Sequence, residues 1–266
     1  MHKPFLRWAG GKTQLLSSIR ELYPEKIDTY YEPFLGGGAV FFDLAPDQYL
    51  ISDSNPELIN AYKVVASRSS ELLKKLSEMQ DNKKFFYSQR ALKYENLDSV
   101  SAAARTIYLN KTCFNGLYRV NKNGEFNVPY GKHNNPDFVQ NKKINFASKL
   151  LKSRRIKCMD FKSIQNINFS KNDFIFFDPP YVPLDGYADF KRYTKEQFNE
   201  NSQVELAEIF HILSKRKVKM LLTNSNTPLI DELYAGFDRK VIESNRSINS
   251  LSSNRKGQDV IIYTNI

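Results

Sequence analysis

The chain has 266 residues, of which 41% are hydrophobic, and its formal net charge at pH 7 is +10. This length allows one large domain or a core domain with an insert. No apolar stretch approaches the roughly 20 residues that span a bilayer, and no apolar secretion signal follows the N-terminus, so we expect a cytoplasmic protein without a membrane partner. The excess of Lys and Arg favours a polyanion partner, although it also serves solubility.

Two cysteines and three histidines leave little material for a metal site or a disulfide framework. Cys113 and Cys158 lie far apart, and neither belongs to a Cys-x-x-Cys or Cys/His ligand pattern. We therefore expect no bound metal and no structural disulfide.

The first motif is Arg-Trp-Ala-Gly-Gly-Lys-Thr, from Arg7 to Thr13. Its end is similar to a phosphate-binding P-loop, but that motif needs a glycine where this chain has Leu6, so a nucleotide triphosphatase is disfavoured. The glycine pair instead indicates a tight turn into a helix over residues 12–22. The turn would bring Trp8 and Lys12 to a neighbouring site. Alternatively, Trp8 is a core residue and Lys12 a solvated helix start.

The second motif is a strand, a glycine turn and an apolar helix start, over residues 29–42. Glycines at such a turn let the backbone approach a ligand closely. The dinucleotide fingerprint is only partly matched, because Phe41 stands where its third glycine would be. A second strand over 49–53 ends on Asp53, a position from which an acid accepts hydrogen bonds from ribose hydroxyls. These features favour S-adenosylmethionine over NAD, since no pyrophosphate site is indicated.

Residues 56–110 have a polar, helical pattern. It begins with Asn55 as a cap and Pro56 at the first helical position. Few β-branched runs occur in it, so we expect several helices that interrupt the sheet as an inserted subdomain. The expected division is a catalytic domain from residues 1–56 and 141–266, and a target-recognition insert from residues 57–140.

The insert ends in a basic, aromatic segment, residues 112–132. Asn123-Gly124 between two short apolar-containing runs is a strong hairpin signal. Such a hairpin can lie against DNA. Arg119 could make a bidentate contact to a guanine edge, worth about 1–3 kcal/mol of discrimination, and Phe114 or Leu117 could wedge into the stack beside a flipped base. The alternative is a structural hairpin that carries exposed charge.

After the insert the α/β pattern resumes at Lys142. A helix leads to a short strand at 155–158, followed by Asp160 and Phe161. Asp160 could bond the adenine amino group of a donor, and Phe161 could lie against its ring. Further helices are expected over 204–214 and 227–234, and further strands over 220–223, 240–243 and 260–264.

The central motif is the apolar run 174–177 followed by Asp178-Pro179-Pro180-Tyr181. The run is typical of a strand buried on both faces of a parallel sheet, and Asp178 would lie at the edge where open α/β sheets bind ligands. The prolines hold Asp178 and Pro179 extended, which leaves a rigid group of acceptors beside the Tyr181 ring. Two such acceptors would pull an exocyclic amine toward a reactive geometry while the ring stacks on the base. Alternatively, Asp-Pro-Pro is an ordinary turn.

Together these motifs resemble the DNA adenine methylase family, the group-alpha N6-adenine DNA methyltransferases of the D12 class. The resemblance rests on the stretches Arg7–Lys12, Pro33–Gly38, Asp53, Asn115–Arg119, Gly124–Pro129 and Asp178–Tyr181. Their order, donor motif, then target-recognition insert, then catalytic motif, defines that group. The implied fold is α/β, a Rossmann-like S-adenosylmethionine-dependent methyltransferase fold with an inserted helical target-recognition domain that carries a β-hairpin.

The motifs and the resemblance together give an expected site. The catalytic residues are Asp178, Pro179 and Tyr181. The donor-binding residues are Trp8, Lys12, Phe34, Gly36, Gly38, Asp53, Asp160, Phe161 and Asp178. The DNA-binding residues are Arg7, Phe114, Asn115, Leu117, Arg119, Pro129 and Lys132.

The resemblance implies methyl transfer from S-adenosylmethionine to N6 of a flipped adenine in double-stranded DNA, the activity EC 2.1.1.72. The sequence does not indicate the oligomeric state, and we expect a monomer. GATC is the commonest target of relatives with this hairpin. One rival is an RNA or protein-amide N-methyltransferase, since the acceptor group suits any planar NH2. Another is a non-catalytic DNA-binding protein with a vestigial donor pocket.

Overall fold

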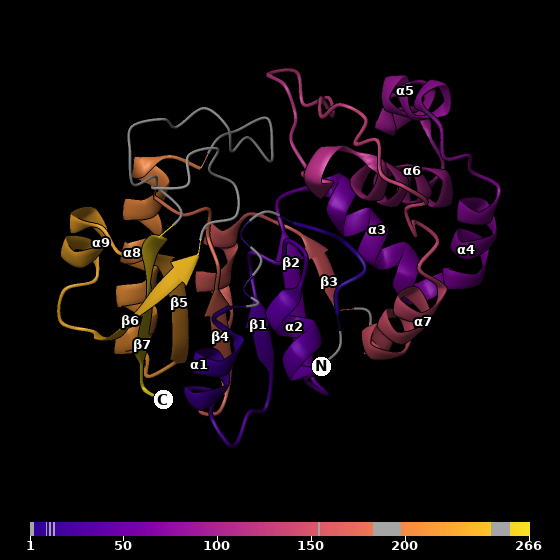
Figure 1. Ribbon diagram of the computed structural model, residues 1–266. Coiled ribbons are helices and arrows are strands. Elements are labelled where there is room, and N and C mark those ends of the chain that lie inside the picture. The colour runs from indigo at the N-terminus through magenta and orange to yellow at the C-terminus, as the bar shows by residue number, and fades with distance from the viewer. Residues whose placement is uncertain are drawn as a thin grey trace.

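The computed structural model describes residues 3–8, 10, 12, 14–153, 155–182, 198–245 and 256–266. These residues form a seven-stranded sheet in the order β3-β2-β1-β4-β5-β7-β6, with helices on both faces (Figure 1). The strands are β1 (Tyr30–Glu32), β2 (Tyr49–Asp53), β3 (Ile156–Cys158), β4 (Phe174–Phe177), β5 (Lys219–Ser225), β6 (Asp238–Asn245) and β7 (Lys256–Thr264).

The first five strands in chain order are parallel, and β7 runs antiparallel to both of its neighbours. The chain winds outward from β1 to β3 and then returns to β4, so the winding direction reverses between β1 and β4. Ligands bind outside the carboxyl ends of the strands at such a reversal. This topology confirms the predicted Rossmann-like architecture and places the end of β4, where Asp178 follows, at that crevice.

Each face of the sheet has its own buried core. In β4, Phe174 and Phe176 pack on one face and Ile175 and Phe177 on the other, because strand side chains alternate. The first face is covered by α1 (Leu16–Glu21), α2 (Ala39–Leu44) and α3 (Pro56–Ser67); the second by the 3-10 helix η4 (Phe161–Asn166), α8 (Glu200–Lys215) and α9 (Pro228–Leu233). Burial on both sides explains the unbroken apolar run of β4.

The helices between β2 and β3 gather beside the β3 edge of the sheet (Figure 1). After α3 they are α4 (Ser69–Ser77), α5 (Lys83–Ala91), η1 (Tyr94–Asn96), α6 (Ser99–Thr112), η2 (Phe114–Gly116), α7 (Asn141–Leu150) and η3 (Leu151–Ser153). Leu72 and Phe86 from these helices join the same core as Tyr30 of the sheet. The insert and the sheet are therefore packed together, and the domain boundaries at residues 56 and 140 stay a prediction.

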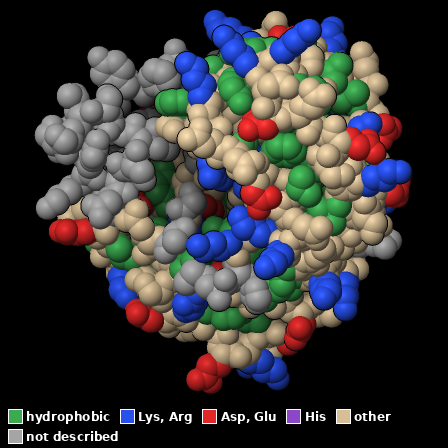
Figure 2. Space-filling view, turned by 45° about the vertical axis from the view of Figure 1, so that its right-hand side comes forward, with side chains coloured by type: hydrophobic (Ala, Val, Ile, Leu, Met, Phe, Trp, Pro, Cys, Tyr) green, Lys and Arg blue, Asp and Glu red, His purple; other side chains and the backbone are tan. Residues whose placement is uncertain are grey.

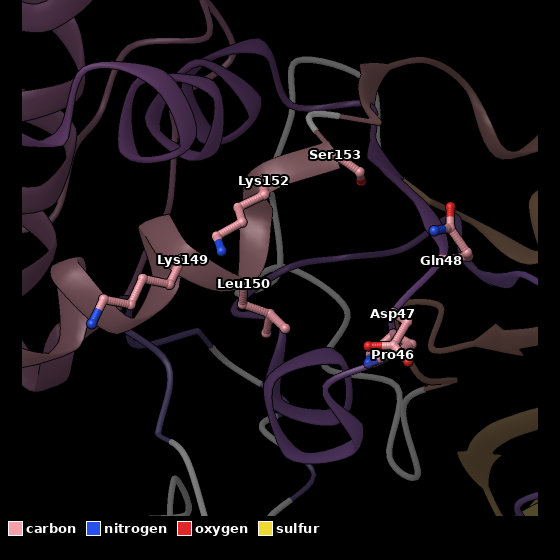
Figure 3. Close-up of a pocket in the computed structure, with 7 residues that line it drawn as sticks. All are labelled: Pro46, Asp47, Gln48, Lys149, Leu150, Lys152 and Ser153. Carbon is pink, nitrogen blue, oxygen red and sulfur yellow. The ribbon is translucent and has the colours of Figure 1, made fainter.

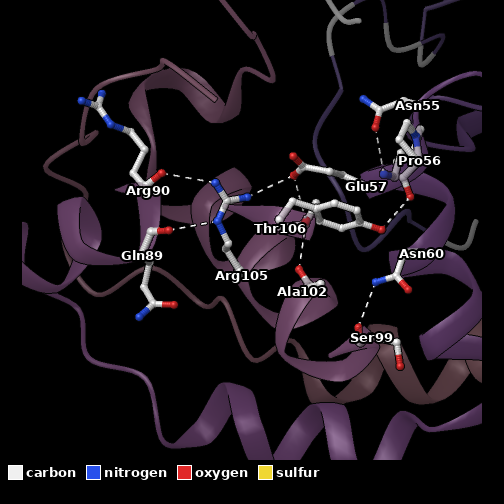
Figure 4. Close-up of polar contacts among 12 residues, drawn as sticks. Asn55, Pro56, Glu57, Asn60, Gln89, Arg90, Ser99, Ala102, Arg105 and Thr106 are labelled. Atoms are coloured by element: carbon white, nitrogen blue, oxygen red, sulfur yellow. Dashed lines mark hydrogen bonds and ion pairs between the residues drawn. The ribbon is translucent and has the colours of Figure 1, made fainter. Parts of the chain in front are cut away.

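A buried ion pair holds the insert helices to one another. Arg105 of α6 donates from Nη1 to Glu57 Oε2 of α3 at 3.1 Å, and from Nε to the Gln89 carbonyl of α5 at 2.9 Å (Figure 4). Its Nη2 reaches the Arg90 carbonyl, and the Arg90 side chain in turn donates to the Val128 carbonyl of the hairpin at 3.2 Å. The Arg105 guanidinium thus supplies hydrogen-bond donors to carbonyls at the end of α5, and it links α3, α5 and α6.

The predicted helix over 12–22 is shorter in the structure, where α1 begins at Leu16. Leu15 occupies the cap position and makes no side-chain capping bond, so the helix has no strong start signal. Only a turn, with the Leu15 N–H donating to the Lys12 carbonyl at 2.8 Å, precedes it. Lys12 therefore lies before the helix, and residues 9, 11 and 13 lie outside the described part of the chain.

The predicted hairpin forms, but without regular strands: Val120 and Phe126 make a single antiparallel bridge. The Asn121 N–H donates to the Glu125 carbonyl at 2.9 Å, and Gly124, at φ +84°, closes the turn. A three-residue loop with a left-handed glycine is a common hairpin connection. The Asn55 cap on α3 is also confirmed, since its side chain accepts from the Leu58 N–H.

Candidate active site

Asp178 and Lys12 meet at the carboxyl end of β4. Lys12 Nζ lies 2.6 Å from Asp178 Oδ1, and the Thr223 hydroxyl of β5 donates to the same oxygen at 2.9 Å. The ammonium also lies 4.4 Å from the centre of the Tyr181 ring and donates to the Gly10 carbonyl at 2.5 Å. The Lys12 side chain is only 5% exposed, so this cation is part of the site and not a solvated helix start.

Burial raises the pKa of Asp178 from its ordinary value, while Lys12 and the Thr223 hydroxyl act in the opposite direction. A second acid, Glu32 at the end of β1, is buried and accepts a hydrogen bond from the Tyr30 hydroxyl at 2.8 Å. Burial raises the pKa of Glu32 well above its ordinary value, and the neighbouring charge of Asp178 adds to the rise. The carboxyl groups of Glu32 and Asp178 therefore lie close to the Lys12 ammonium at the same edge of the sheet.

The backbone after Asp178 is fixed by two buried amides. Gln203 of α8 donates from Nε2 to the Pro180 carbonyl at 2.8 Å. Asn224 of β5 accepts from the Val182 N–H at 3.0 Å and donates to Gln203 Oε1 at 3.1 Å. These bonds hold the rigid proline segment against the sheet. The backbone around Pro179 is therefore fixed by contacts from both α8 and β5.

The glycine turn after β1 is bound to Asp53. Asp53 Oδ2 accepts from the Gly36 N–H at 3.0 Å and Oδ1 accepts from the Asn55 N–H at 2.9 Å. Burial raises the pKa of Asp53, and these backbone donors lower it. Gly36 has φ +49°, and a Cβ there would stand 2.8 Å from Trp8 Cδ1, so the indole lies directly against the turn. Gly38 likewise has φ +69°.

Aromatic rings line the neighbouring strand ends. Phe34 stacks on Phe161 with ring centres 5.2 Å apart. Phe198 packs nearly perpendicular to Phe34, with ring centres 5.6 Å apart. Asp160 is exposed and caps η4 by accepting from the Lys162 N–H at 2.8 Å. The structure therefore brings Phe161 to Phe34. A bond from Asp160 to the donor adenine stays a prediction.

The predicted wedge residues lie at an exposed corner. Phe114 is 51% exposed, Asn115 is exposed at φ +55°, and Leu117 is half-buried. The Phe114 N–H donates to the carbonyl of the exposed Pro129 at 2.9 Å. An apolar ring held outward by a fixed backbone is suited to enter a base stack.

The predicted base-reading arginine is already oriented within the hairpin. Arg119 donates from Nε to Asn127 Oδ1 at 2.8 Å. A guanidinium carries four further N–H donors on its two terminal nitrogens, which is the fork that a guanine edge accepts. Lys132 is exposed, at φ +52°.

Arg7 is tied to the base of this hairpin. Its backbone N–H donates to Asn110 Oδ1 at 2.8 Å and its carbonyl accepts from Asn110 Nδ2 at 2.7 Å. Its side chain lies so close to Gly116 that a Cβ there would stand 2.4 Å from Arg7 Cδ. Lys111 is buried nearby, and burial, reinforced by Lys143 and Arg7, lowers the pKa of Lys111 to about 7. Figure 2 shows Lys and Arg side chains gathered near the middle of one face of the molecule.

A pocket of about 380 Å³ lies elsewhere, at the other end of the strands. Its lining comes from residues 46–48, which precede β2, and from the end of α7 with η3 (Figure 3). Since β2 runs from Tyr49 to Asp53, this pocket is at the edge opposite Asp53. It belongs to neither the donor turn nor the Asp178 segment.

Several residues of the site were not singled out from the sequence. They are Glu32, Tyr118, Gln203, Thr223 and Asn224. Asn224 had a signal, because the apolar strand β5 turns polar at Thr223-Asn224-Ser225 on reaching the ligand edge. Gln203 had none, since a polar residue in an amphipathic helix is ordinary.

No helix within the described residues combines the length and apolarity that crossing a membrane requires. Within the same residues, no three His, Cys, Asp or Glu side chains are grouped as metal ligands would be.

Residues 8–248 match the family model of the D12 class N6 adenine-specific DNA methyltransferases. The chain is 42% identical to the Type II methyltransferase M.MjaIII of Methanocaldococcus jannaschii, over 96% of this chain and 95% of that one. It is 41% identical to the Type II methyltransferase M1.LlaDCHI of Lactococcus lactis subsp. cremoris, over 99% and 95%. It is 32% identical to the DNA adenine methylase of Escherichia coli K12, over 98% and 94%.

These comparisons confirm the resemblance inferred from the order of the motifs, and they favour adenine in DNA over the RNA and protein-amide rivals. The chain belongs to the D12 class N6 adenine-specific DNA methyltransferases.

Proposed function

We propose that this protein transfers a methyl group from S-adenosylmethionine to N6 of an adenine flipped out of double-stranded DNA, within GATC, the activity EC 2.1.1.72. One observation carries the proposal. Asp178 lies at the ligand edge of a parallel sheet, its carboxylate held by Lys12 and Thr223, with the Tyr181 ring beside it.

The chemistry requires an inert nitrogen to become a nucleophile. The lone pair of an adenine amino group is delocalised into the ring, so acceptors on its two hydrogens favour a tetrahedral nitrogen. Asp178 and the Pro179 carbonyl are the proposed acceptors, and a preorganised pair of this kind stabilises developing positive charge on the nitrogen. When the new C–N bond forms, the bond between the methyl carbon and the sulfonium sulfur of the donor breaks, its electron pair stays on the sulfur, and the nitrogen loses one proton. Asp178, whose pKa burial raises, is the proposed acceptor of that proton.

The donor pocket offers several carboxyl oxygens as hydrogen-bond acceptors to its ligand. S-adenosylmethionine supplies an electrophilic methyl group on a sulfonium. Glu32, Asp53 and Asp178 approach one edge of the sheet, where Lys12 is the cation that pairs with Asp178. Asp53 is fixed by two backbone donors, and its remaining lone pairs are the proposed acceptors for the ribose hydroxyls of the donor. These residues fit the donor without requiring a metal ligand.

The proposal for duplex DNA and for GATC rests on the recognition hairpin. Arg119 is held by Asn127 and is the proposed contact to a guanine edge, and the exposed Phe114 is the proposed wedge into the gap left by the flipped base. Flipping costs a few kcal/mol of unstacking, which the wedge and the stacking of the base on Tyr181 would offset.

The test is transfer of labelled methyl groups to three otherwise identical duplexes. The first contains GATC, and the second contains GTAC and so has the same number of adenines. The third contains GATC in which the adenine N6 is already methylated on both strands. We expect incorporation only into the first duplex. Equal labelling of GATC and GTAC would contradict the GATC assignment, and labelling of the premethylated duplex would contradict N6 as the acceptor.

A further inference from the structure

Tyr118 links the recognition hairpin to the donor pocket. It directly precedes Arg119, it is only 4% exposed, and its ring stacks on Trp8 with centres 4.7 Å apart and planes 20° from parallel. The sequence motifs did not indicate this contact, because the two residues belong to separate motifs. A stacked pair of this kind contributes to packing beyond the area it buries.

On its donor side, the stack rests against the glycine turn. A Cβ at Gly36 would stand 2.8 Å from the Trp8 ring, and one at Gly37 would stand 3.0 Å from Trp8 Cβ, so the indole is in contact with both. Burial raises the pKa of Tyr118, and the neighbouring Asn55 side chain acts in the opposite direction, so the two side chains lie close together. Asn55 in turn donates its N–H to Asp53. Tyr118 is therefore linked to the glycine turn through Trp8 and to Asp53 through Asn55.

On its DNA side, Tyr118 packs within the hairpin. Its ring packs edge-to-face with that of Phe126, with ring centres 5.6 Å apart. The next residue, Arg119, accepts from the Asn127 N–H at 3.1 Å and donates to Asn127 Oδ1 at 2.8 Å, so its position is set by the hairpin backbone. A displacement of the Tyr118 ring would displace Arg119, because the two are adjacent and share that backbone.

We propose that Tyr118 is a positioning residue, which makes occupancy of the donor pocket and recognition of DNA by Arg119 depend on each other. The inference rests on the proposed function and adds a coupling that the function itself does not require. Coupling between two bound ligands is reciprocal, so DNA should tighten donor binding by the same factor by which the donor tightens DNA binding. Typical couplings of this kind are roughly 5–150-fold.

The chain offers an internal probe of the contact, since Trp8 is its single tryptophan. Its fluorescence reports on the stack and on the glycine turn together. We would titrate sinefungin, an unreactive donor analogue, into the protein with and without a GATC duplex, and a GTAC duplex as control. The ratio of the two dissociation constants is the coupling factor.

Three variants separate positioning from packing. Tyr118→Leu removes the stack, Tyr118→Phe keeps the ring but removes the hydroxyl beside Asn55, and Phe126→Leu removes a buried hairpin ring that does not stack on Trp8. We expect the coupling factor to fall to about 1 in Tyr118→Leu and to stay closer to wild type than to 1 in Tyr118→Phe and Phe126→Leu. Circular dichroism and thermal unfolding establish that each variant is folded.

Equal loss of coupling in Phe126→Leu and Tyr118→Leu would overturn the inference, because general loosening of the hairpin would then explain it. Wild-type coupling in Tyr118→Leu, or no coupling in the wild-type protein, would also overturn it. Sinefungin carries no transferable methyl group, so these outcomes are independent of turnover. Failure of the proposed function would instead appear as absent methyl transfer to GATC by the wild-type protein.

Discussion

Lys12 and Asp178 form an ion pair across the ligand edge of the sheet, with Nζ 2.6 Å from Oδ1. The lysine comes from the N-terminal motif and the aspartate from the end of β4, so the contact exists only in the folded protein. The same ammonium lies over the Tyr181 ring. The pair therefore joins the expected donor site to the expected catalytic segment.

The first prediction concerns the pH dependence of methyl transfer by Lys12→Gln. Burial raises the pKa of Asp178 above its ordinary value of 3.8, and Lys12 opposes that rise. Removing the cation therefore raises the pKa further, and the ionised carboxylate is lost at a higher pH. We expect the acidic limb of the kcat profile, measured at saturating donor and DNA, to move to higher pH. Lys152→Gln, at the opposite end of the sheet, is the control.

An unchanged acidic limb in Lys12→Gln would show that Asp178 does not set the pH dependence. A shift of the acidic limb to lower pH would mean that Lys12 raises the pKa of Asp178, and so would contradict the prediction.

A second prediction concerns the stability of Glu32→Gln. Burial raises the pKa of Glu32 well above 4.5, so the folded protein holds this proton at pH values where the unfolded chain has released it. The free energy of unfolding then falls as pH rises through that range, by about 1.4 kcal/mol for each unit of difference in pKa. Glutamine can still accept from Tyr30 but has no proton to release. We expect the variant to gain stability relative to wild type as the pH rises above 4.5, the ordinary pKa of a glutamate.

Denaturant unfolding of both proteins over that range provides the measurement. A constant difference between the two would mean that Glu32 titrates alike in the folded and unfolded states.

The buried pair of Arg105 and Glu57 gives a third prediction. Arg105→Met removes the cation paired with Glu57, which keeps the hydrogen bond from the Thr106 hydroxyl, and it removes the donor to the carbonyls at the end of α5 (Figure 4). Removing one partner of a buried pair costs about 3–5 kcal/mol of folding free energy. We expect the double variant Glu57→Gln with Arg105→Met to be less destabilised than Arg105→Met alone. A loss well below 1 kcal/mol in the single variant would contradict the role given to this pair.

Phe114 gives a fourth prediction, because its ring is half exposed at the proposed wedge position. Phe114→Ala should lower kcat/KM on a paired GATC site by about 10–100-fold, since the wedge offsets part of the cost of flipping. The loss should shrink when the target adenine stands opposite an abasic position, where less pairing must be broken. Leu92→Ala removes another exposed apolar side chain and serves as control. Equal losses on both substrates would show that Phe114 does not assist flipping.

The strands, the start of α3 and the turn of the hairpin could be predicted because their signals are local. Residues 174–177 are buried on both faces and therefore unbroken in their apolar character. Asn55 and Pro56 begin α3 as their side chains dictate. Gly124 marks the turn of the hairpin through its positive φ. In each case a few adjacent residues carry the physical reason for the structure.

Other features could not be predicted, since they depend on contacts between distant segments. The helix α1 begins only at Leu16, because the segment before it places Lys12 against Asp178. The bond from Gln203 to the Pro180 carbonyl requires α8 to pack against the end of β4. No spacing in the sequence encodes such a contact.

The most direct test of the central claim is single-turnover methyl transfer by Asp178→Ala at saturating donor and GATC duplex, with DNA binding measured in parallel. Losing a preorganised acceptor should slow transfer by roughly 100- to 1,000-fold or more, while DNA binding and its dependence on salt remain those of the wild-type protein. Transfer at close to the wild-type rate would contradict the account, because the carboxylate at the end of β4 would then have no part in activating the adenine amine.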